Sequence, residues 1–427
     1  MTYSKLNFYP PLLNSFLVHL TQFIAPCVAS WFFQFELVVS HECLEKIRSL
    51  KNQRLLLLPN HPTFQDPIVM FVLSAKLGQM FYYLAAYELF NGSLGELFQR
   101  LGVYSIRRGL VDRPSIAHTL ALLTQQCCRL VVFPEGGCSF QNDTVMPFRV
   151  GAVQIAFQAM SKIVKQGEPI PDLYVIPVSI KYRYIQDMTK AIAQTLNRLE
   201  QALNLTVVSS STPYERLRAI AQQVLVKVEQ EYGVHTRATS QLPWDQRIFL
   251  LRNYVLENCE QQLGISSNPK ELARERTYRI AYVLKTKINE LESQTGVPES
   301  NMLAVNFDLS PEVTPINSSL ALIEKSVKRL LNFDAICDGY VAENPTPERF
   351  LDTLVRLERE VFDIDKPPAK GYRQAKVKIG EPVNLKDFFA DFERDRAGTV
   401  NAVTLKIQQS VQHNLDLLNQ EANAMTG

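Results

Sequence analysis

The sequence lacks any Cys-x-x-Cys spacing, any low-complexity tract and any excess of one charge, and each absence excludes a class of protein. Its 7 cysteines are odd in number, which argues against a closed disulfide framework, and their spacing does not fit a structural zinc site. A reducing compartment is the simplest interpretation. Lysine and arginine (45) nearly balance aspartate and glutamate (43), so the net charge of +2 does not indicate a nucleic-acid partner. The 427 residues, 46% of them hydrophobic, are enough for a folded protein of more than one domain.

The chain also lacks a convincing membrane-spanning run, although residues 10–39 are its most apolar long stretch. Polar residues and a proline interrupt this stretch, whereas a spanning helix needs about 20 mostly apolar residues. The interruptions are Asn14, His19, Gln22, Pro26, Gln34 and Glu36. A basic start followed by a small-residue cleavage site is missing too, which argues against a secretory signal. Residues 1–34 are therefore expected to form either a helix packed on the core or an apolar segment lying in a membrane interface.

Between residues 35 and 190, short apolar runs alternate with helical patterns, which predicts an α/β domain with a mixed sheet flanked by helices. The predicted strands are 35–39, 54–59, 81–86, 103–108, 128–134 and 173–182. Asp66 followed by Pro67 fits an N-cap and a first helical position, so a helix is predicted from Pro67 to Lys76. A second helix is predicted from about Pro114 to Gln126.

Amphipathic helical patterns replace the strand patterns between residues 191 and 370. Thr212, Pro213 and Glu215 form a capping box with proline at the first helical position. Further helices are predicted within 243–264, 272–293, 318–332 and 346–362, and because they follow no fixed period they indicate a bundle rather than a repeat array. A strand-like segment at 376–383 and a helix from about 399 to 418 come next. Residues 191–370 are therefore predicted to be a large all-α insertion, and residues 371–427 to supply the closing strand and last helix of the α/β domain.

Residues 59–66 read Pro-Asn-His-Pro-Thr-Phe-Gln-Asp and leave the strand 54–59 with a histidine and, five positions on, an aspartate. A histidine in a turn is by itself more often a hydrogen-bonding residue than a catalytic base. Three further motifs, at 102–109, 131–137 and 175–182, also lie at predicted strand ends. Loops at the strand ends of an open α/β sheet commonly form the ligand crevice, so these motifs are expected to lie near His61.

These segments, in this order, resemble the sequence blocks of the glycerol-3-phosphate and lysophosphatidic acid acyltransferase family. Asn60, His61 and Asp66 match the first block, which is Asn-His, four residues, Asp. Residues 102–108 match the second block, a glycine followed by a strand ending in arginine, and residues 175–180 match the fourth, which contains Ile-Pro-Val. The resemblance covers roughly residues 35–185 and implies an acyltransferase-type fold.

The third block departs from the family pattern. The family has Phe-Pro-Glu-Gly-Thr-Arg-Ser, and this chain keeps the Phe-Pro-Glu-Gly at 133–136 and Ser139, but Gly137 and Cys138 replace the threonine and the arginine. The segment 146–156 resembles the basic residue and Gly-Ala that follow the third block in the family. The segment 377–385 resembles the strand that closes the family domain, which supports the insertion.

The resemblance implies that His61 is a general base and that Asp66 orients it. Neutral imidazole can take the proton of an attacking hydroxyl near physiological pH, and a carboxylate on the other ring nitrogen selects the tautomer and stabilises the imidazolium. Asp66 can cap the helix with one oxygen and bind His61 with the other. No enzyme nucleophile is then required, and the chain contains no Gly-x-Ser-x-Gly elbow. Cys138 is interpreted as a small buried thiol rather than as a nucleophile.

A phosphate-bearing acceptor requires a cation, and the planar fork of arginine fits a phosphate better than lysine does. Arg108 is the predicted anchor, and the resemblance also assigns Asn60, Glu135 and Gly136 to the substrate side. Because the usual arginine of the third block is absent, another arginine is expected to compensate. The candidates are Arg107, Arg113 and Arg149, each of which could equally be a solvated surface residue.

The predicted function is transfer of a fatty acyl group from acyl-CoA or acyl-carrier protein to a glycerolipid hydroxyl, first of all that of 1-acyl-glycerol-3-phosphate, in phospholipid biosynthesis. Glycerol-3-phosphate or another lysophospholipid is the alternative acceptor, and a non-catalytic lipid-surface protein on the same fold is the alternative to an enzyme. No cofactor, metal or nucleic acid is expected. Peripheral or monotopic attachment to the cytoplasmic face of a membrane is expected through the N-terminal segment, with Pro26 between two short helices. The predicted interfacial side chains are Phe16, Leu17, Leu20, Phe23, Ile24, Trp31 and Phe32.

Overall fold

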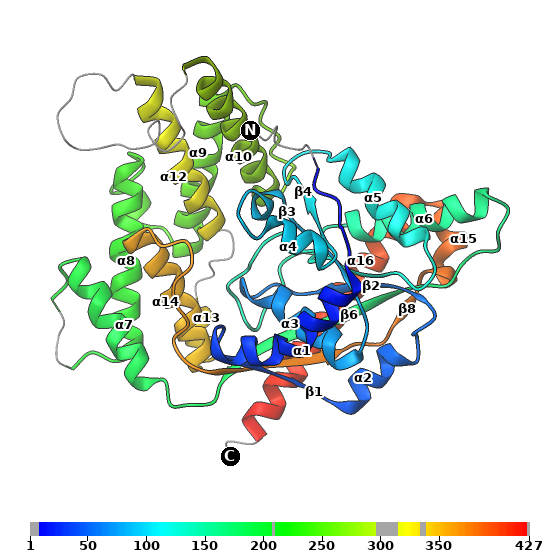
Figure 1. Cartoon of the computed structure of the whole chain (residues 1–427). Helices are drawn as coiled ribbons and strands as arrows, with labels where there is room; N and C mark the ends of the chain where they lie inside the picture. The colour runs from blue at the N-terminus through cyan, green and yellow to red at the C-terminus, as the bar shows by residue number, and fades with distance from the viewer. Residues whose placement is uncertain (1–7, 207–209, 296–314, 334–338, 425–427) are drawn as a thin grey trace.

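The computed structural model describes residues 8–206, 210–295, 315–333 and 339–424 (Figure 1). The parts of the predicted segments that fall on other residues, including both chain ends, lie outside the described ranges. The strands are β1 (Phe35–Val39), β2 (Arg54–Pro59), β3 (Tyr82–Ala86), β4 (Val103–Ile106), β5 (Arg129–Val131), β6 (Leu173–Tyr184), β7 (Arg373–Ile379) and β8 (Val383–Asn384). Short 3₁₀ helices are η1 (Tyr87–Phe90), η2 (Thr239–Gln241) and η3 (Leu385–Phe388).

The α-helices fall into an N-terminal set, a central set and a C-terminal pair. The N-terminal set is α1 (Ser15–Trp31), α2 (His41–Arg48), α3 (Asp66–Leu77), α4 (Gly95–Arg100), α5 (Arg113–Thr124) and α6 (Gly151–Lys165). The central set is α7 (Thr189–Ala202), α8 (Pro213–Glu231), α9 (Trp244–Leu263), α10 (Ala273–Thr295), α12 (Pro315–Phe333), α13 (Tyr340–Glu343) and α14 (Pro347–Phe362). The C-terminal pair is α15 (Phe389–Arg394) and α16 (Arg396–Ala424).

Eight strands of the described ranges form one sheet in the order β1-β7-β6-β2-β5-β3-β4, and β8 pairs with β6. Strands β6, β2, β5, β3 and β4 are parallel to one another, whereas β7 is antiparallel to β6. The carboxyl ends of the parallel strands therefore lie at one edge of the sheet, where an α/β fold commonly forms its site. The predicted fold class, a mixed α/β sheet with a large helical region, is confirmed.

Strand β2 lies in the middle of the sheet and is buried on both faces. Leu55 and Leu57 join the apolar cluster under α1, α2 and α3, while Leu56 and Leu58 join the cluster under α5, α6 and α16. All four side chains are fully buried, as expected of a strand covered by helices on both sides. The first motif therefore follows directly after a strand that is fully buried between two layers of helices.

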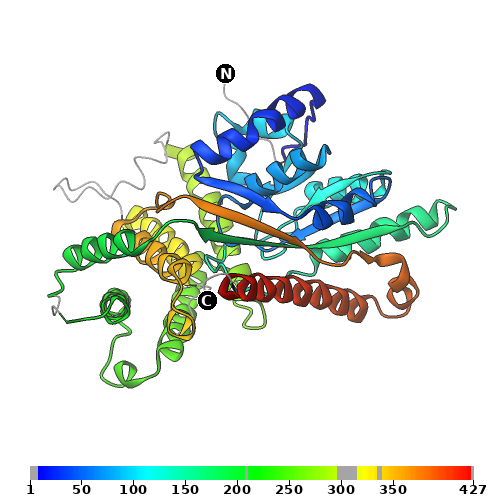
Figure 2. The ribbon, with the colours of Figure 1, turned by 90° about the horizontal axis from the view of Figure 1, so that it is seen from below.

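Strand β7 lies inside the sheet, between β1 and β6, although it follows the whole helical region in the sequence. Seen from below, β6 and β7 run side by side across the molecule, with α16 beneath them (Figure 2). The predicted closing segment 376–383 is divided between β7 and β8. Strand β7, which follows the helical region, is thus an internal strand of the sheet.

The central helices α7 to α14 enclose an apolar cluster of their own, separate from the two clusters of the sheet. In Figure 1 they lie together on one side of the sheet, coloured green to orange. Two of them, α10 and α14, send side chains to the loops at the strand ends. The helical region is therefore in direct contact with the part of the sheet that carries the motifs.

Helix α1 is continuous from Ser15 to Trp31 and contains Pro26, so the prediction of two short helices separated by this proline is wrong. Its inner face is fixed to the core, since Val18, Ala25 and Ala29 are buried. The Gln22 amide also donates to Ser74 Oγ of α3 and to the Gln79 carbonyl, at 3.0 and 2.9 Å. This packing supports the helix where the proline removes one backbone bond.

Candidate active site

His61 and Asp66 form a hydrogen-bonded pair in the turn between β2 and α3. Nδ1 of His61 lies 2.7 Å from Oδ2 of Asp66. The carboxylate accepts the Nδ1 proton, which leaves Nε2 as the basic nitrogen. The imidazole is 14% exposed and the carboxylate 0%, so a substrate can reach the base and not its partner.

Asp66 does not cap α3, contrary to the prediction. The cap position is Gln65, which makes no side-chain cap bond. Both carboxylate oxygens are used elsewhere: Thr63 donates its amide to Oδ2 (2.8 Å) and its hydroxyl to Oδ1 (3.1 Å), and the Tyr182 hydroxyl donates to Oδ1 (2.7 Å). With His61, four donors bind the two oxygens of this carboxylate, so neither oxygen accepts a hydrogen bond from the backbone amides of α3. Burial and the Asp66 charge hold the pKa of Tyr182 well above its usual value, so this hydroxyl keeps its proton.

The His61 ring is in contact with both Phe133 and Cys138. The ring centroids of His61 and Phe133 are 4.4 Å apart. The Cys138 sulfur lies 3.6 Å from Nε2 and 3.9 Å from Nδ1, and such similar distances place it over the ring face rather than in line with the Nε2 lone pair. This position does not suit proton transfer from the thiol, and Cys138 is half-buried, as a packing residue can be.

The groups next to His61 favour its protonated, imidazolium form. Burial lowers its pKa, but the adjacent Cys138 and the Asp66 carboxylate together outweigh burial and raise the pKa well above its usual value. The basic form needed to accept a proton is therefore the one populated at higher pH.

Glu135 of the third motif is buried directly behind His61. Its Oε1 accepts the His61 backbone amide at 3.0 Å, and the amide of Ser139 donates to the His61 carbonyl at 2.8 Å. Oε2 of Glu135 is buried without a hydrogen-bond partner in the described part of the chain. Burial raises the pKa of Glu135 to about 7. The first and third motifs are thus joined in both directions through the His61 backbone.

Asn60 faces the sheet. Its side-chain amide donates to the Ile180 carbonyl (3.0 Å) and accepts the Ile180 amide (2.7 Å), and the side chain is 1% exposed. These bonds connect the first motif to the fourth, on β6. The predicted substrate contact of Asn60 stays a prediction, since the geometry shows a bond between loop and strand.

Arg108 and Arg149 both lie near the ring of Tyr278, a residue of α10. The Arg108 guanidinium is 4.3 Å from the Tyr278 ring centroid and that of Arg149 is 5.5 Å from it. Arg108 also donates to the Tyr278 hydroxyl (2.9 Å) and lies near Glu88 (3.4 Å), while Arg149 pairs with Glu275 (2.8 Å). Two cations therefore gather beside the third motif, each balanced by one carboxylate.

The other two candidate arginines are placed differently. Arg107 is bound to Asp112, through its guanidinium at 3.1 Å and its backbone amide at 2.7 Å. Arg113 is an exposed residue at the start of α5. Of the three arginines predicted to compensate for the missing one, the structure brings Arg149 to the side of Arg108.

The glycines of the second and third motifs make room for α10 and Arg149. A Cβ at Gly137 would lie 2.4 Å from the Tyr278 hydroxyl, and one at Gly109 would lie 2.3 Å from the Tyr278 backbone. Gly136, at φ +74°, leaves no room for a side chain because the Arg149 guanidinium is 2.3 Å from its Cβ position. The glycine that replaces the family's threonine at position 137 thus has a steric reason in this chain.

Arginines of the helical region hold the third-motif loop. Arg274 donates to the carbonyls of Glu135 (3.1 Å), Gly137 (2.9 Å) and Cys138 (3.4 Å), and Arg356 donates to the Ser139 carbonyl. Burial lowers the pKa of Arg356 to about 10, which still leaves it charged at neutral pH. Sequence reasoning missed Tyr182, Arg274, Tyr278 and Arg356; the one available signal was the pair of replacements at positions 137 and 138.

Residues 39–181 match the family model described as Acyltransferase. The matched range contains His61, Asp66, Arg108, Glu135 and Arg149. No curated protein matches the chain. Residues 39–181 are therefore similar to acyltransferase domains, and this similarity supports a transferase with acyltransferase activity in general. Within the described ranges, no three or more His, Cys, Asp and Glu side chains are grouped as a metal site would need.

Proposed function

We propose that this protein transfers a fatty acyl group from a thioester donor to a hydroxyl of a glycerolipid, with 1-acyl-glycerol-3-phosphate as the acceptor. The observation that carries the proposal is the His61–Asp66 pair, bonded at 2.7 Å at the end of β2, inside a range that matches the acyltransferase family. The His61 side chain is partly exposed, at 14%, which suits a base that must reach a bound hydroxyl. The donor is acyl-CoA or acyl-carrier protein.

In the proposed reaction, Nε2 of His61 takes the proton of the acceptor hydroxyl as its oxygen attacks the thioester carbonyl carbon. The carbon–sulfur bond then breaks, and the imidazolium returns the proton to the leaving thiolate. The Asp66 carboxylate holds the ring by Nδ1 and stabilises the imidazolium between the two steps. No acyl-enzyme forms, which agrees with the position of the Cys138 sulfur over the ring face.

Arg108 and Arg149 are the proposed contacts of the acceptor phosphate. Both guanidiniums lie beside the third motif, and both have a buried nitrogen without a hydrogen-bond partner in the described ranges, Nε of Arg108 and Nη2 of Arg149. Their present partners, Glu88 and Glu275, are carboxylates that a phosphate dianion could replace. Glycerol-3-phosphate or another lysophospholipid offers the same charge and is the alternative acceptor.

Membrane attachment through α1 belongs to the same proposal. None of the helices in the described ranges is long and apolar enough to cross a membrane. Phe16, Phe23 and Trp31 are 78%, 83% and 81% exposed on the face of α1 that points away from the core. Such a row of large apolar side chains on a packed helix suits peripheral or monotopic insertion into a lipid interface, on the cytoplasmic side where a lysolipid acceptor would be taken up.

The test is an acceptor and donor panel with the purified full-length chain. Thiol release is measured from acyl-CoA and from acyl-carrier protein, with 1-acyl-glycerol-3-phosphate, glycerol-3-phosphate, an uncharged monoacylglycerol or no acceptor, and the lipid product is identified by mass spectrometry. We expect release to depend on the acceptor and the phosphate-bearing acceptors to exceed monoacylglycerol. Equal rates with monoacylglycerol would contradict the acceptor assignment, and a blank panel from folded protein would favour the non-catalytic lipid-surface alternative.

A further inference from the structure

A cavity of about 130 Å³ lies in the helical region, between α8, α9, α12 and α14. A water molecule needs about 10 to 15 Å³ on the same measure, so the space is far larger than one solvent site. Most of its wall is apolar and buried, including Leu217, Val224, Leu251 and Leu357. One side reaches the surface, where Arg218 is exposed. The cavity thus has an open polar rim and a buried apolar interior.

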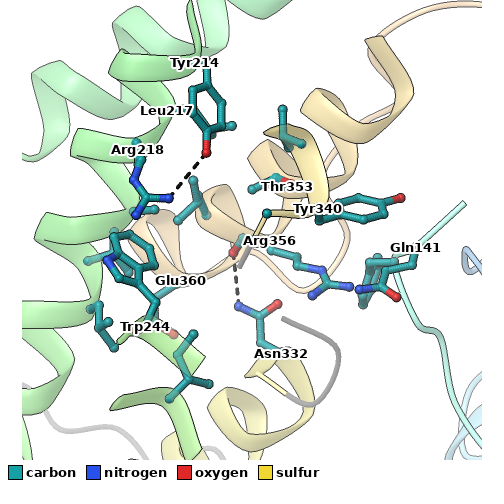
Figure 3. A pocket seen from close by; sticks show the side chains of 18 of the residues that line it. Gln141, Tyr214, Leu217, Arg218, Trp244, Asn332, Tyr340, Thr353, Arg356 and Glu360 are labelled. Atoms are coloured by element: carbon teal, nitrogen blue, oxygen red, sulfur yellow. Dashed lines mark hydrogen bonds between the residues drawn. The ribbon is translucent and has the colours of Figure 1, made fainter. Parts of the chain in front are cut away.

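Another part of the cavity wall is formed by the loop that carries the third motif. Phe140 and Gln141 follow the third motif directly and line the cavity, together with Arg356 of α14. Figure 3 shows the Arg356 side chain extending toward Gln141, across from Tyr214 and Arg218 on α8. Arg356 also donates to the carbonyl of Ser139, whose amide binds His61. One arginine thus contacts both the cavity and the loop that holds the base.

We propose that this cavity holds a single fatty-acyl chain of a substrate of the site. The inference rests on the proposed function, which requires a long acyl chain near His61 in both the donor and a lysolipid acceptor. An apolar cavity next to a catalytic loop suits such a chain, since each methylene removed from water contributes about 0.8 kcal/mol, or about fourfold in affinity.

Binding can be measured without the reaction, because the sequence has 2 tryptophans and Trp244 lines the cavity. Trp31 is exposed on α1, so Trp31→Phe leaves Trp244 as the single reporter. In this background we expect dibromostearic acid, below its micelle concentration, to quench Trp244 in a saturable manner. Unbrominated stearic acid should reverse the quenching, and octanoic acid should not. If saturating dibromostearic acid leaves Trp244 unquenched, the inference is overturned.

A matched pair of variants on α8 locates the binding. Ala221 lines the cavity, whereas Ala219 on the same helix is exposed and does not. Ala221→Phe should weaken binding about tenfold or more, the equivalent of roughly two displaced methylenes, while Ala219→Phe should not change it. Thr353→Phe narrows the cavity from α14 and should act like Ala221→Phe. Equal binding by all three folded variants would place the chain elsewhere and overturn the inference.

Kinetics then identify which substrate supplies the chain. If the donor chain occupies the cavity, Ala221→Phe should shift the preferred acyl-CoA to a shorter chain without changing the preference among lysolipids. If the acceptor chain occupies it, the same variant should shift the preferred lysolipid to a shorter chain and leave the preference among acyl-CoA donors unchanged. If neither preference shifts although quenching is lost, the chain bound is not a substrate chain and the inference is overturned. A blank activity panel together with intact, Ala221-dependent quenching would instead remove the proposed function and leave an acyl-chain site. His61→Ala should keep the quenching.

Discussion

His61 and Asp66 of the α/β region are five residues apart and contact each other within the turn between β2 and α3. Arg274, Tyr278 and Arg356 of the helical region instead bind the neighbouring third-motif loop, from 136 to 217 residues away. The first pair is the chemical machinery that we propose. The second set donates to backbone carbonyls of the third motif or packs on the arginines beside it. The reactive groups thus come from a turn at the end of a strand, whereas the conformation of the third-motif loop depends on helices α10 and α14 of the helical region.

This division means that substitutions in the two sets of residues should change different kinetic quantities. Changes to the His61–Asp66 turn should affect turnover. Changes to Arg108 and to the helical residues that hold the third-motif loop should affect substrate fit more than the chemical step. The predictions below test this division, beginning with the largest effect.

His61→Ala should reduce turnover about a hundredfold to ten-thousandfold, because the acceptor hydroxyl loses its base. Asp66→Asn should lie in the same range, since an amide cannot accept all four bonds that the carboxylate accepts. The measurement is acceptor-dependent thiol release, with circular dichroism as a check of folding. His41→Ala, on an exposed histidine of α2, is the matched control and should behave as the parent protein. Near-normal turnover of His61→Ala would remove the general-base assignment.

Arg108→Ala should raise the acceptor concentration needed for half-maximal rate about tenfold to a hundredfold, the usual worth of a charge-assisted contact. The corresponding concentration of acyl donor should change little. Arg113→Ala serves as the control, because Arg113 is exposed at the start of α5. Equal effects on donor and acceptor would show that Arg108 acts on the site as a whole and is no phosphate anchor.

Phe16→Ser combined with Phe23→Ser should weaken vesicle binding about tenfold or more, since two large apolar side chains lose their contact with lipid. Co-sedimentation with phosphatidylcholine vesicles containing anionic lipid measures it, and activity on detergent-dispersed acceptor should persist. These substitutions are sharper than deletion of the segment, because the buried face of α1 stays intact. Phe249→Ser, on an exposed phenylalanine of α9, asks whether the helical region binds lipid instead. A larger loss from Phe249→Ser would move the membrane contact to that region.

Tyr278→Phe should raise the half-maximal acceptor concentration about twofold to tenfold, the range of one neutral hydrogen bond. The change removes the hydroxyl that accepts from Arg108 at 2.9 Å and donates to the Gly136 carbonyl at 3.0 Å. Tyr282→Phe, one turn later on α10 and exposed, is the control. If turnover fell and acceptor affinity did not, the helical region would take part in the chemical step. That result would contradict the division between a catalytic turn and helices that shape the loop.

Cys138→Ala should leave maximal turnover within about threefold, because the thiol lies over the His61 ring and is not used as a nucleophile. It should also shift the pH profile. The base works as neutral imidazole, so the rate falls as pH drops through the His61 pKa, and Cys138 is one of the groups that raise this pKa. Without it the acidic limb of the profile should move to lower pH. Abolished turnover, or an acyl adduct on Cys138 released by hydroxylamine, would contradict the assignment.

The sequence predicted those parts of the fold that depend on neighbouring residues. Each of the strands predicted between 35 and 182 overlaps an observed strand, and helices predicted at 213 onward, 243–264, 272–293 and 346–362 are present. The His61–Asp66 pair is visible in the sequence because one turn brings these residues together. Helix capping by Asp66 was a sound expectation from the Asp-Pro pattern, but Tyr182, 116 residues away, takes an oxygen that the helix would have used.

The contacts made by the helical region could not be predicted in this way, since they depend on where α10 and α14 pack. Arg274 and Arg356 are two of many arginines on amphipathic helices, and neither has a local pattern that marks it. The sequence suggested that the replacement of arginine by Cys138 costs the phosphate site a contact. For the neighbouring replacement of threonine by Gly137 the structure gives a steric reason that the sequence did not show, because the space is taken by the Tyr278 hydroxyl.

The internal position of β7 has a consequence for the order in which the chain can fold during synthesis. Strand β1 is at the edge of the sheet and pairs with β7, so it has no strand partner until residues 373–379 leave the ribosome. By then the ribosome has completed the whole helical region, while β6 has carried an open edge on the side that β7 will occupy. Unpaired strand edges promote association between chains, so nascent or truncated chains that end before β7 should be the aggregation-prone species of this protein.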